Sequence, residues 1–173
     1  MEANATLPNG VYRIRNVNKP LGSEYLRESA EKIYNDERTF VVTGQNTSGI
    51  LGSWMWLIER VADGNVYTLR NLNKDTNYGY LRETSKKLYS DDRTYVSTGR
   101  QNMKDPGCWS WVIEKFNEEG VYTIRNRGKK SNVSYLRESS KELSGDGNTQ
   151  HVATGPKSAS DEGCWTWVIE RAQ

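Results

Sequence analysis

Catalytic chemistry would need residue types that this chain hardly supplies. It has a single histidine, His151, so a histidine-rich metal site cannot form and a histidine-based triad has one possible base. The acidic pairs Asp36/Glu37 and Asp91/Asp92 lie between strand-like segments, where aspartate favours turns. Paired carboxylates for glycoside hydrolysis must face each other in environments that separate their pKa values. Neighbouring residues on a loop do not meet that need, so we expect neither an enzyme nor a metal or other cofactor.

Recognition is better supported, because two related segments combine tyrosine, aspartate and arginine. These segments are KIYNDERTF at 32–40 and KLYSDDRTY at 87–95, whereas the third copy, ELSGDGNTQH at 142–151, loses the tyrosine and the arginine. Such a trio offers an apolar face with donors and acceptors, which suits a sugar or a protein partner. Sequence drift at a hairpin tip is the alternative. With one tyrosine from the loop at 72–79 and the aspartate that the third copy keeps, the candidate ligand-binding residues are Tyr34, Asp36, Arg38, Tyr78, Tyr89, Asp91, Arg93 and Asp146.

Arginine and glutamate also recur at fixed positions. A guanidinium group suits carboxylate, sulfate or phosphate, so the arginines could form three anion sites. They could instead form Arg–Glu pairs across neighbouring strands, and we favour the pairs because acidic residues recur as often. The repeated residues are Arg15, Arg70 and Arg125; Arg27, Arg82 and Arg137; Glu28, Glu83 and Glu138; and Glu59, Glu114 and Glu170.

All these residues belong to a unit that occurs three times. Each copy starts with a G/N-V-Y-x-[IL]-R-N segment and continues with Y-L-R-E, with a segment ending in Thr-Gly, and with W-x-W-[LV]-I-E. Segments rich in Val, Ile, Tyr, Trp and Thr, separated by Gly, Asn, Asp and Ser, predict four short strands per copy, and no stretch has a sustained helical period. The sequence therefore predicts one domain over 1–173, with repeats at 9–63, 64–119 and 120–173.

Alternation along these strands predicts the side chains that face inward. Ile14, Leu26, Val41, Trp56 and Ile58, with their equivalents, form a pseudo-threefold core. The tryptophans of each W-x-W pair share a face with the following isoleucine, so we expect all six indoles in the core rather than in a stacking platform for sugars. These pairs are Trp54/Trp56, Trp109/Trp111 and Trp165/Trp167.

Three further residues are predicted to fill space. Cys108 and Cys164 stand where the first copy has Ser53, which indicates two small buried thiols rather than a disulfide. His151 aligns with Phe40 and Tyr95, which indicates a third aromatic-type filler.

Twelve strands in three units must protect their edges, and a closed barrel does so. The repeat resembles the β-trefoil superfamily, particularly the ricin-B-type lectins, whose unit ends in Q-x-W followed by an aliphatic residue. Over residues 9–173, W-x-W-[LV]-I takes that place, with Trp56, Trp111 and Trp167 matching the family's tryptophan. We therefore predict an all-β fold, a β-trefoil of twelve strands in three pseudo-threefold repeats. A three-sheet β-prism is the alternative.

The resemblance does not extend to the family's galactose site. The aspartate that follows the second-strand leucine in ricin-type repeats is replaced by Arg27, Arg82 and Arg137. The aromatic platform after the third strand is replaced by Thr-Gly, at Gly44, Gly99 and Gly155. A galactose site of the usual kind is therefore not expected, although a glycan could bind elsewhere.

The composition of the chain limits the classes of partner that it is expected to bind. Lysine and arginine number 24 against 22 acidic residues, and a net charge of +2 is too small for a nucleic-acid footprint. No apolar run reaches membrane-spanning length, and the start MEANATLPNG lacks a signal-peptide pattern, so we expect a cytoplasmic protein, or one secreted by a non-classical route.

The leading prediction is a lectin-like carbohydrate-binding protein that recognises glycans or glycoconjugates through surface loops on several repeats. The alternative is a protein-interaction β-trefoil, such as an actin-associated or protease-inhibiting module.

Overall fold

A computed structural model describes residues 7–18, 25–34, 38–45, 54–73, 77–88, 93–101, 104–116, 120–129, 131–143, 146–157 and 162–172. Over these residues the chain forms twelve strands and three short 3₁₀ helices. The strands are β1 (Gly10–Asn16), β2 (Tyr25–Lys32), β3 (Thr39–Gly44), β4 (Met55–Ala62), β5 (Val66–Asn71), β6 (Tyr80–Lys87), β7 (Thr94–Gly99), β8 (Trp111–Lys115), β9 (Val121–Asn126), β10 (Tyr135–Leu143), β11 (Asp146–Gly155) and β12 (Trp167–Arg171). The 3₁₀ helices are η1 (Pro106–Trp109), η2 (Ser131–Val133) and η3 (Glu162–Trp165). The all-β prediction is confirmed.

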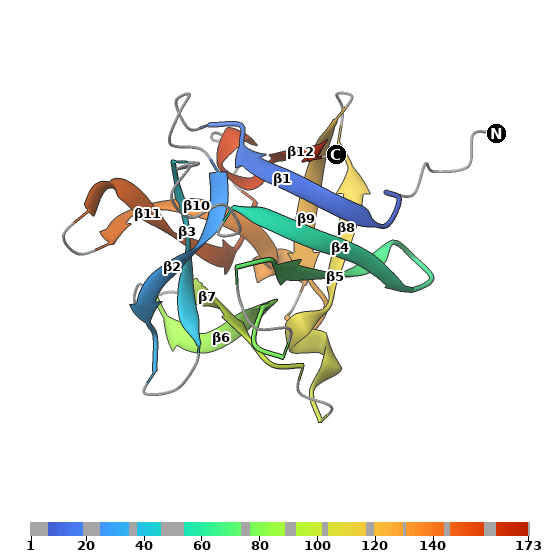
Figure 1. The fold of residues 1–173 in the computed structure, drawn as a ribbon, viewed down its shortest axis with the longest axis horizontal. Helices are drawn as coiled ribbons and strands as arrows, with labels where there is room; N and C mark the ends of the chain where they lie inside the picture. Colours follow the sequence, from blue (N-terminus) through green and yellow to red (C-terminus); the bar gives the residue numbers. More distant parts are fainter. Residues whose placement is uncertain are drawn as a thin grey trace.

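Six of the strands close into a barrel. Each pairs antiparallel with the next around the ring β1–β4–β5–β8–β9–β12, and β12 pairs with β1. They are the first and fourth strands of each repeat, and Figure 1 shows most of them gathered on one side of the molecule. Because every barrel strand has two partners, the barrel leaves no open edge for another chain to join.

The second and third strands of each repeat form three hairpins that cap the barrel. These are β2–β3, β6–β7 and β10–β11, and β3, β7 and β11 also pair with one another. A six-stranded barrel capped by a triplet of hairpins is a β-trefoil, as predicted, and the three pseudo-threefold repeats are called lobes one, two and three below.

The predicted inward side chains form the core of the barrel. Ile14, Leu26, Val41, Trp56 and Ile58 belong to one buried cluster with their equivalents from the other lobes. The indole N–H groups of Trp56, Trp111 and Trp167 donate to the backbone carbonyls of Leu26, Leu81 and Leu136, over 2.9, 2.8 and 2.8 Å. Each lobe thus ties its fourth strand to its second through a buried hydrogen bond.

The first tryptophan of each W-x-W pair lies elsewhere, so the prediction of six core indoles is wrong for these three. Trp54 precedes β4 in a turn, and Trp109 and Trp165 end the 3₁₀ helices η1 and η3. Alternation holds only along extended backbone, and the turn before the strand breaks it. Trp54 and Trp109 are half-buried, and Trp165 is buried outside the barrel core, against Phe116.

A second, smaller cluster fills the centre of the three hairpins. Phe40, Tyr95 and His151 meet there, with ring centroids 4.7 to 5.1 Å apart, so the alignment of His151 with two aromatic residues is confirmed. Burial, together with the nearby Lys141 ammonium, lowers the pKa of His151 to about 4.

Three smaller expectations concern the thiols, metals and membranes. Cys108 and Cys164 are free and buried, as predicted, and burial raises the pKa of Cys108. In the described part of the chain, no group of three or more His, Cys, Asp or Glu side chains is placed to hold a metal ion. None of its helices is long and apolar enough to cross a membrane.

Candidate functional site

The second-strand arginines lie at the positions where the ricin-type pattern has its galactose-site aspartate. Their stems lie on the glycines of the Thr-Gly segments, with Cδ atoms 3.2, 2.6 and 3.2 Å from where a Cβ would stand on Gly44, Gly99 and Gly155. Their guanidinium groups donate to the carbonyls of Gln45, Arg100 and Pro156, over 2.9, 3.0 and 2.7 Å. A larger side chain at the glycine would displace the arginine. The two departures from the ricin-type pattern are therefore coupled.

The first-strand arginines behave as predicted, at least in two lobes. Arg15 pairs with Glu170 at 2.7 Å and Arg125 with Glu114 at 3.4 Å, and all four side chains are partly exposed. Such pairs contribute little to stability, about 0.2–1 kcal/mol each. The expectation of Arg–Glu pairs thus holds for these residues, while the second-strand arginines bind backbone carbonyls instead.

The hairpin residues reach across to the next lobe. Arg38 of lobe one packs on Gly99 of lobe two, with its Cγ 3.2 Å from the Cβ position. Arg93 of lobe two packs in the same way on Gly155 of lobe three, at 2.7 Å. Thr149 of lobe three takes this place at Gly44 of lobe one. Each surface around a Thr-Gly glycine is therefore composite, and we call the three surfaces the Gly44, Gly99 and Gly155 junctions.

Two of the predicted tyrosines make cation–π contacts with arginines. The Arg38 guanidinium lies over the Tyr34 ring, 3.9 Å from its centroid, and Tyr34 is half-buried against the hairpin cluster. The Arg100 guanidinium lies over the Tyr78 ring at 4.5 Å and donates to the Tyr78 hydroxyl.

The structure does not bring all the predicted site residues together. Arg38 belongs to the Gly99 junction and Arg93 to the Gly155 junction, so the two lie in different places. Asp36, Tyr89 and Asp91 lie outside the described residues. Asp146 begins β11, and its side chain also lies outside what is described. The predicted set as a whole stays a prediction.

A pocket of about 370 Å³ opens in lobe two, beside the Gly99 junction. Its described lining consists of Asn77, Tyr80, Arg100 and Gln101. Tyr80 begins β6 and is the register partner of Gly99 at the end of β7, so Arg100 and Gln101 continue from β7 beside it. The bond from Arg82 to the Arg100 carbonyl holds that segment against β6. An aromatic ring, two amides and a guanidinium thus meet in one hollow.

Sequence reasoning passed over these four residues. The signal that was available is the outward tyrosine that precedes the second-strand leucine in every repeat, at Tyr25, Tyr80 and Tyr135. In lobes one and three this tyrosine lies beside the first tryptophan of the W-x-W pair, with ring centroids 5.9 Å apart for Tyr25 and Trp54 and 6.2 Å for Tyr135 and Trp165. In lobe three the Lys157 ammonium lies over both rings, at 4.8 and 5.4 Å. Each lobe therefore carries a partly exposed aromatic residue next to the segment that follows its third strand.

Comparison with known proteins identifies the fold. No family model matches the chain, and no curated protein matches its sequence. Among solved structures, the Rhizoctonia solani agglutinin is similar at 18% identity and a TM-score of 0.64, with 98% of this chain and 99% of that chain covered. A salivary protein from Culex, of the Cysteine and Tryptophan-Rich family, is similar at 22% identity and a TM-score of 0.62, with 99% of both chains covered.

A lectin from Polyporus squamosus, solved with a Neu5Ac-containing epitope bound, is similar at 18% identity and a TM-score of 0.63. The match covers 96% of this chain and 50% of that chain. The chain thus has the β-trefoil fold that these lectins share, and the resemblance stated from the repeats is confirmed for the fold. At such low identity the likeness carries no function with it.

Proposed function

We propose that this chain is a glycan-binding β-trefoil whose principal sugar site is the lobe-two pocket. The observation that carries the proposal is the joint lining by Tyr80, Asn77, Arg100 and Gln101. A sugar ring has an apolar face, which stacks on an aromatic ring, and hydroxyls, which bond to amides and guanidinium groups. The volume, about 370 Å³, lies within the range of small-ligand pockets.

The aromatic residues of the other lobes support weaker sites of the same kind. Tyr25 with Trp54 and Tyr135 with Trp165 offer ring surfaces at equivalent positions, although lobe three already places Lys157 over its pair. Several weak sites on one rigid barrel gain avidity when a clustered glycan spans them. The lectins that share the fold support this direction without deciding it.

A glycan array followed by calorimetry tests the proposal. We expect the wild-type protein to bind a limited set of glycans, and Tyr80→Ala and Asn77→Ala to weaken that binding about tenfold or more, because each removes a contact at the pocket. Val61→Ala, an exposed residue of β4, is the control and leaves binding unchanged. An array without any binder, together with recovery of a specific protein partner, would instead support the protein-interaction alternative.

A further inference from the structure

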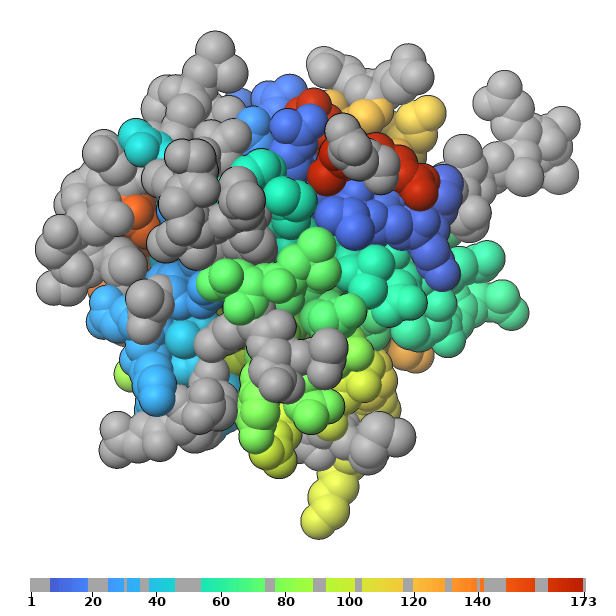
Figure 2. Space-filling model, viewed as in Figure 1, coloured from blue at the N-terminus to red at the C-terminus, as the bar shows by residue number. Residues whose placement is uncertain are grey.

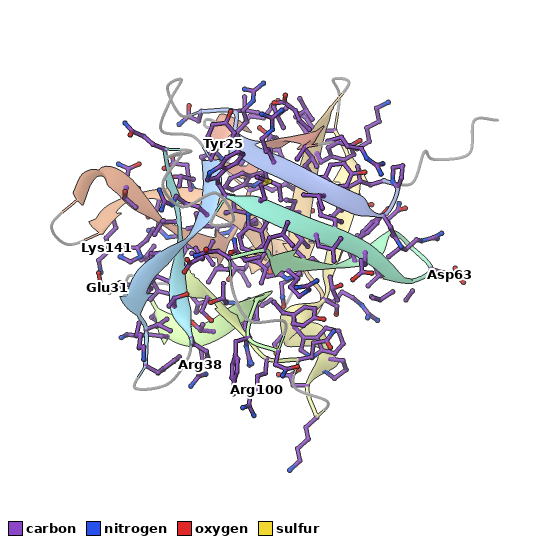
Figure 3. All side chains as sticks on the ribbon, in the orientation of Figure 1. Tyr25, Glu31, Arg38, Asp63, Arg100 and Lys141 are labelled. Carbon is purple, nitrogen blue, oxygen red and sulfur yellow. The ribbon has the colours of Figure 1, made fainter. Side chains whose placement is uncertain are left out.

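The three junctions differ in the number of arginines, and among the described residues the Gly99 junction of lobe two has the most. The stems of Arg82 and Arg38 both lie on Gly99, and Arg100 follows it in the chain and lines the pocket. Figure 3 shows Arg38 and Arg100 along the same edge of the molecule, although they come from different lobes. On the face shown in Figure 2, the β2–β3 hairpin in light blue lies close to lobe-two residues in green.

Among the described residues, the number of arginines is lower at the other two junctions. At Gly155, Arg137 and Arg93 lie on the glycine, and Pro156 and Lys157 follow it. At Gly44, Arg27 is joined by Thr149 rather than by a second arginine, and Gln45 follows. The side chains around the glycine thus change from three arginines in lobe two, to two arginines and a lysine in lobe three, to one arginine in lobe one.

Two acidic side chains among the described residues lie near this charge. Arg82 interacts with Glu83, and Asp105 lies close enough to act on the charge of the same Glu83. Successive residues of a strand point to opposite faces, so the Glu83 side chain lies on the other face of β6 from Arg82. On that face burial raises the pKa of Glu83, and the Lys129 ammonium acts against this rise. Asp105 is exposed just before η1. None of the described residues that line the pocket is acidic.

The arginines are also held in place before any ligand arrives. The guanidinium groups of Arg38 and Arg100 lie over the rings of Tyr34 and Tyr78, and Arg100 also donates to the Tyr78 hydroxyl, so both groups are fixed in position. The Arg82 Nε–H, one bond from the Cδ that lies on Gly99, is buried and has no hydrogen-bond partner among the described residues. Fixed donors lose less conformational entropy when an oxyanion binds.

From this arrangement we propose that the lobe-two site selects acidic sugars, those that carry a carboxylate or a sulfate group, and that the Gly155 junction of lobe three does so more weakly. The proposal rests on the glycan-binding function above and names its ligand class. The sugar ring lies on Tyr80 in the pocket, and its anionic group lies toward Arg100 and the two arginines on Gly99. Planar forks of this kind match carboxylate and sulfate oxygens.

Calorimetry with lactose, sialyllactose and sulfated lactose tests the ligand class at low and at physiological salt. We expect at least one acidic form to bind about tenfold or more tightly than lactose, since hydrogen bonds to a charged group contribute that much. The difference in affinity between the acidic sugars and lactose should become smaller as salt is added. The sialylated and sulfated arms show whether the anion is a carboxylate or a sulfate.

Variants copied from the weaker lobe test the residues. Arg38→Thr copies Thr149, and Arg100→Gln copies Gln45, so each makes lobe two more like lobe one. We expect both to lose the preference for acidic sugars. Lactose binding should change little in Arg38→Thr, because Arg38 is not among the residues that line the pocket, and should weaken in Arg100→Gln, which alters the lining itself. The control is Arg60→Gln, which removes an arginine of the β4–β5 hairpin that pairs with Asp63. This variant should keep the preference for acidic sugars. Thr149→Arg adds an arginine at the Gly44 junction and raises the number of acidic sugars bound per chain.

The outcomes separate this inference from the proposed function. Equal binding of lactose and both acidic forms overturns the acidic preference and leaves glycan binding intact. Binding of no glycan by the folded protein overturns both. An equal loss in Arg60→Gln would show that net charge, rather than the junction, makes the preference. If Arg38→Thr does not fold, Arg38→Lys keeps the charge without the planar fork and is expected to lose part of the preference.

Discussion

His151 shows how one residue can match its symmetry mates in shape and differ from them in chemistry. It packs edge-on against Phe40 and Tyr95 at the centre of the hairpins. Its Nδ1 is buried and has no hydrogen-bond partner in the described part of the chain. The Lys141 ammonium lies 5.3 Å from the centroid of the neighbouring Tyr95 ring, and it opposes a positive charge on His151. The histidine is therefore held neutral in the folded protein.

The free energy of unfolding should consequently fall in mild acid. Between pH 6.5 and about 4 the unfolded chain protonates His151 and the folded protein does not, so stability is full above pH 6.5 and is lost as the pH falls toward 4. Allowing for solvent screening around the exposed Lys141, the loss is about 2 kcal/mol. Urea unfolding at a series of pH values measures it. His151→Phe, which copies Phe40, should remove this part of the pH dependence, and an unchanged slope in that variant would contradict the assignment.

In lobes two and three a 3₁₀ helix leads directly into the fourth strand, and this connection organises the lobe. The turn ends at the first tryptophan, and the strand carries the second one into the core. The indole N–H then binds the second-strand leucine carbonyl of the same lobe. Barrel and hairpin are thereby joined inside each repeat, and the first indole stays outside the barrel core.

Replacing the second tryptophan should cost more than replacing the first. Trp111→Phe leaves the Leu81 carbonyl buried without its donor and opens a space in the core, which we expect to lower the free energy of unfolding by about 2–4 kcal/mol. Trp109→Phe, at a half-buried position two residues earlier, should cost about 1 kcal/mol or less. Chemical denaturation of both variants gives the comparison. Equal losses would mean that the hydrogen bond to Leu81 does not stabilise the lobe.

At the scale of the whole molecule, the strands of each lobe need hydrogen-bond partners from the neighbouring lobes. In lobe two, β5 pairs with β4 of lobe one, and β8 pairs with β9 of lobe three. The third strands likewise pair with one another, in addition to the hairpin partner that each has in its own lobe. The same arrangement builds the composite junctions, because each hairpin reaches the glycine of the next lobe. Folding and site assembly therefore depend on the closed threefold arrangement.

We accordingly expect a single cooperative unfolding transition and no stable isolated repeat. A fragment of residues 64–119 would expose the unpaired edges of β5 and β8 and should remain unfolded or self-associate. Circular dichroism and sedimentation of the fragment, beside the full chain, measure this. A folded monomeric fragment would show that the lobes are independent and would contradict the prediction of one domain over 1–173.

Local patterns in the sequence were enough for the fold and most of the core. The recurring segments predicted the four strands of each lobe, and alternation placed Ile14, Leu26 and Trp56 inside, because an extended strand exposes its two faces in turn whatever surrounds it. The same rule failed for Trp54, Trp109 and Trp165, which lie in turns where the period of two no longer applies.

The surfaces that could bind a ligand were decided by the tertiary structure. The sequence assigned Arg38 and its neighbours to lobes one and two, in the order of the chain, and identified the loss of that arginine in repeat three. Pairing of β3 with β7 and of β7 with β11 moves each hairpin onto the following lobe, so Arg38 and Arg93 supplement lobes two and three, and lobe one receives Thr149. Strand propensity is a local property and repeats along the chain. The contacts between lobes are made only when the barrel closes. They determine at which of the three equivalent glycines the most arginines meet.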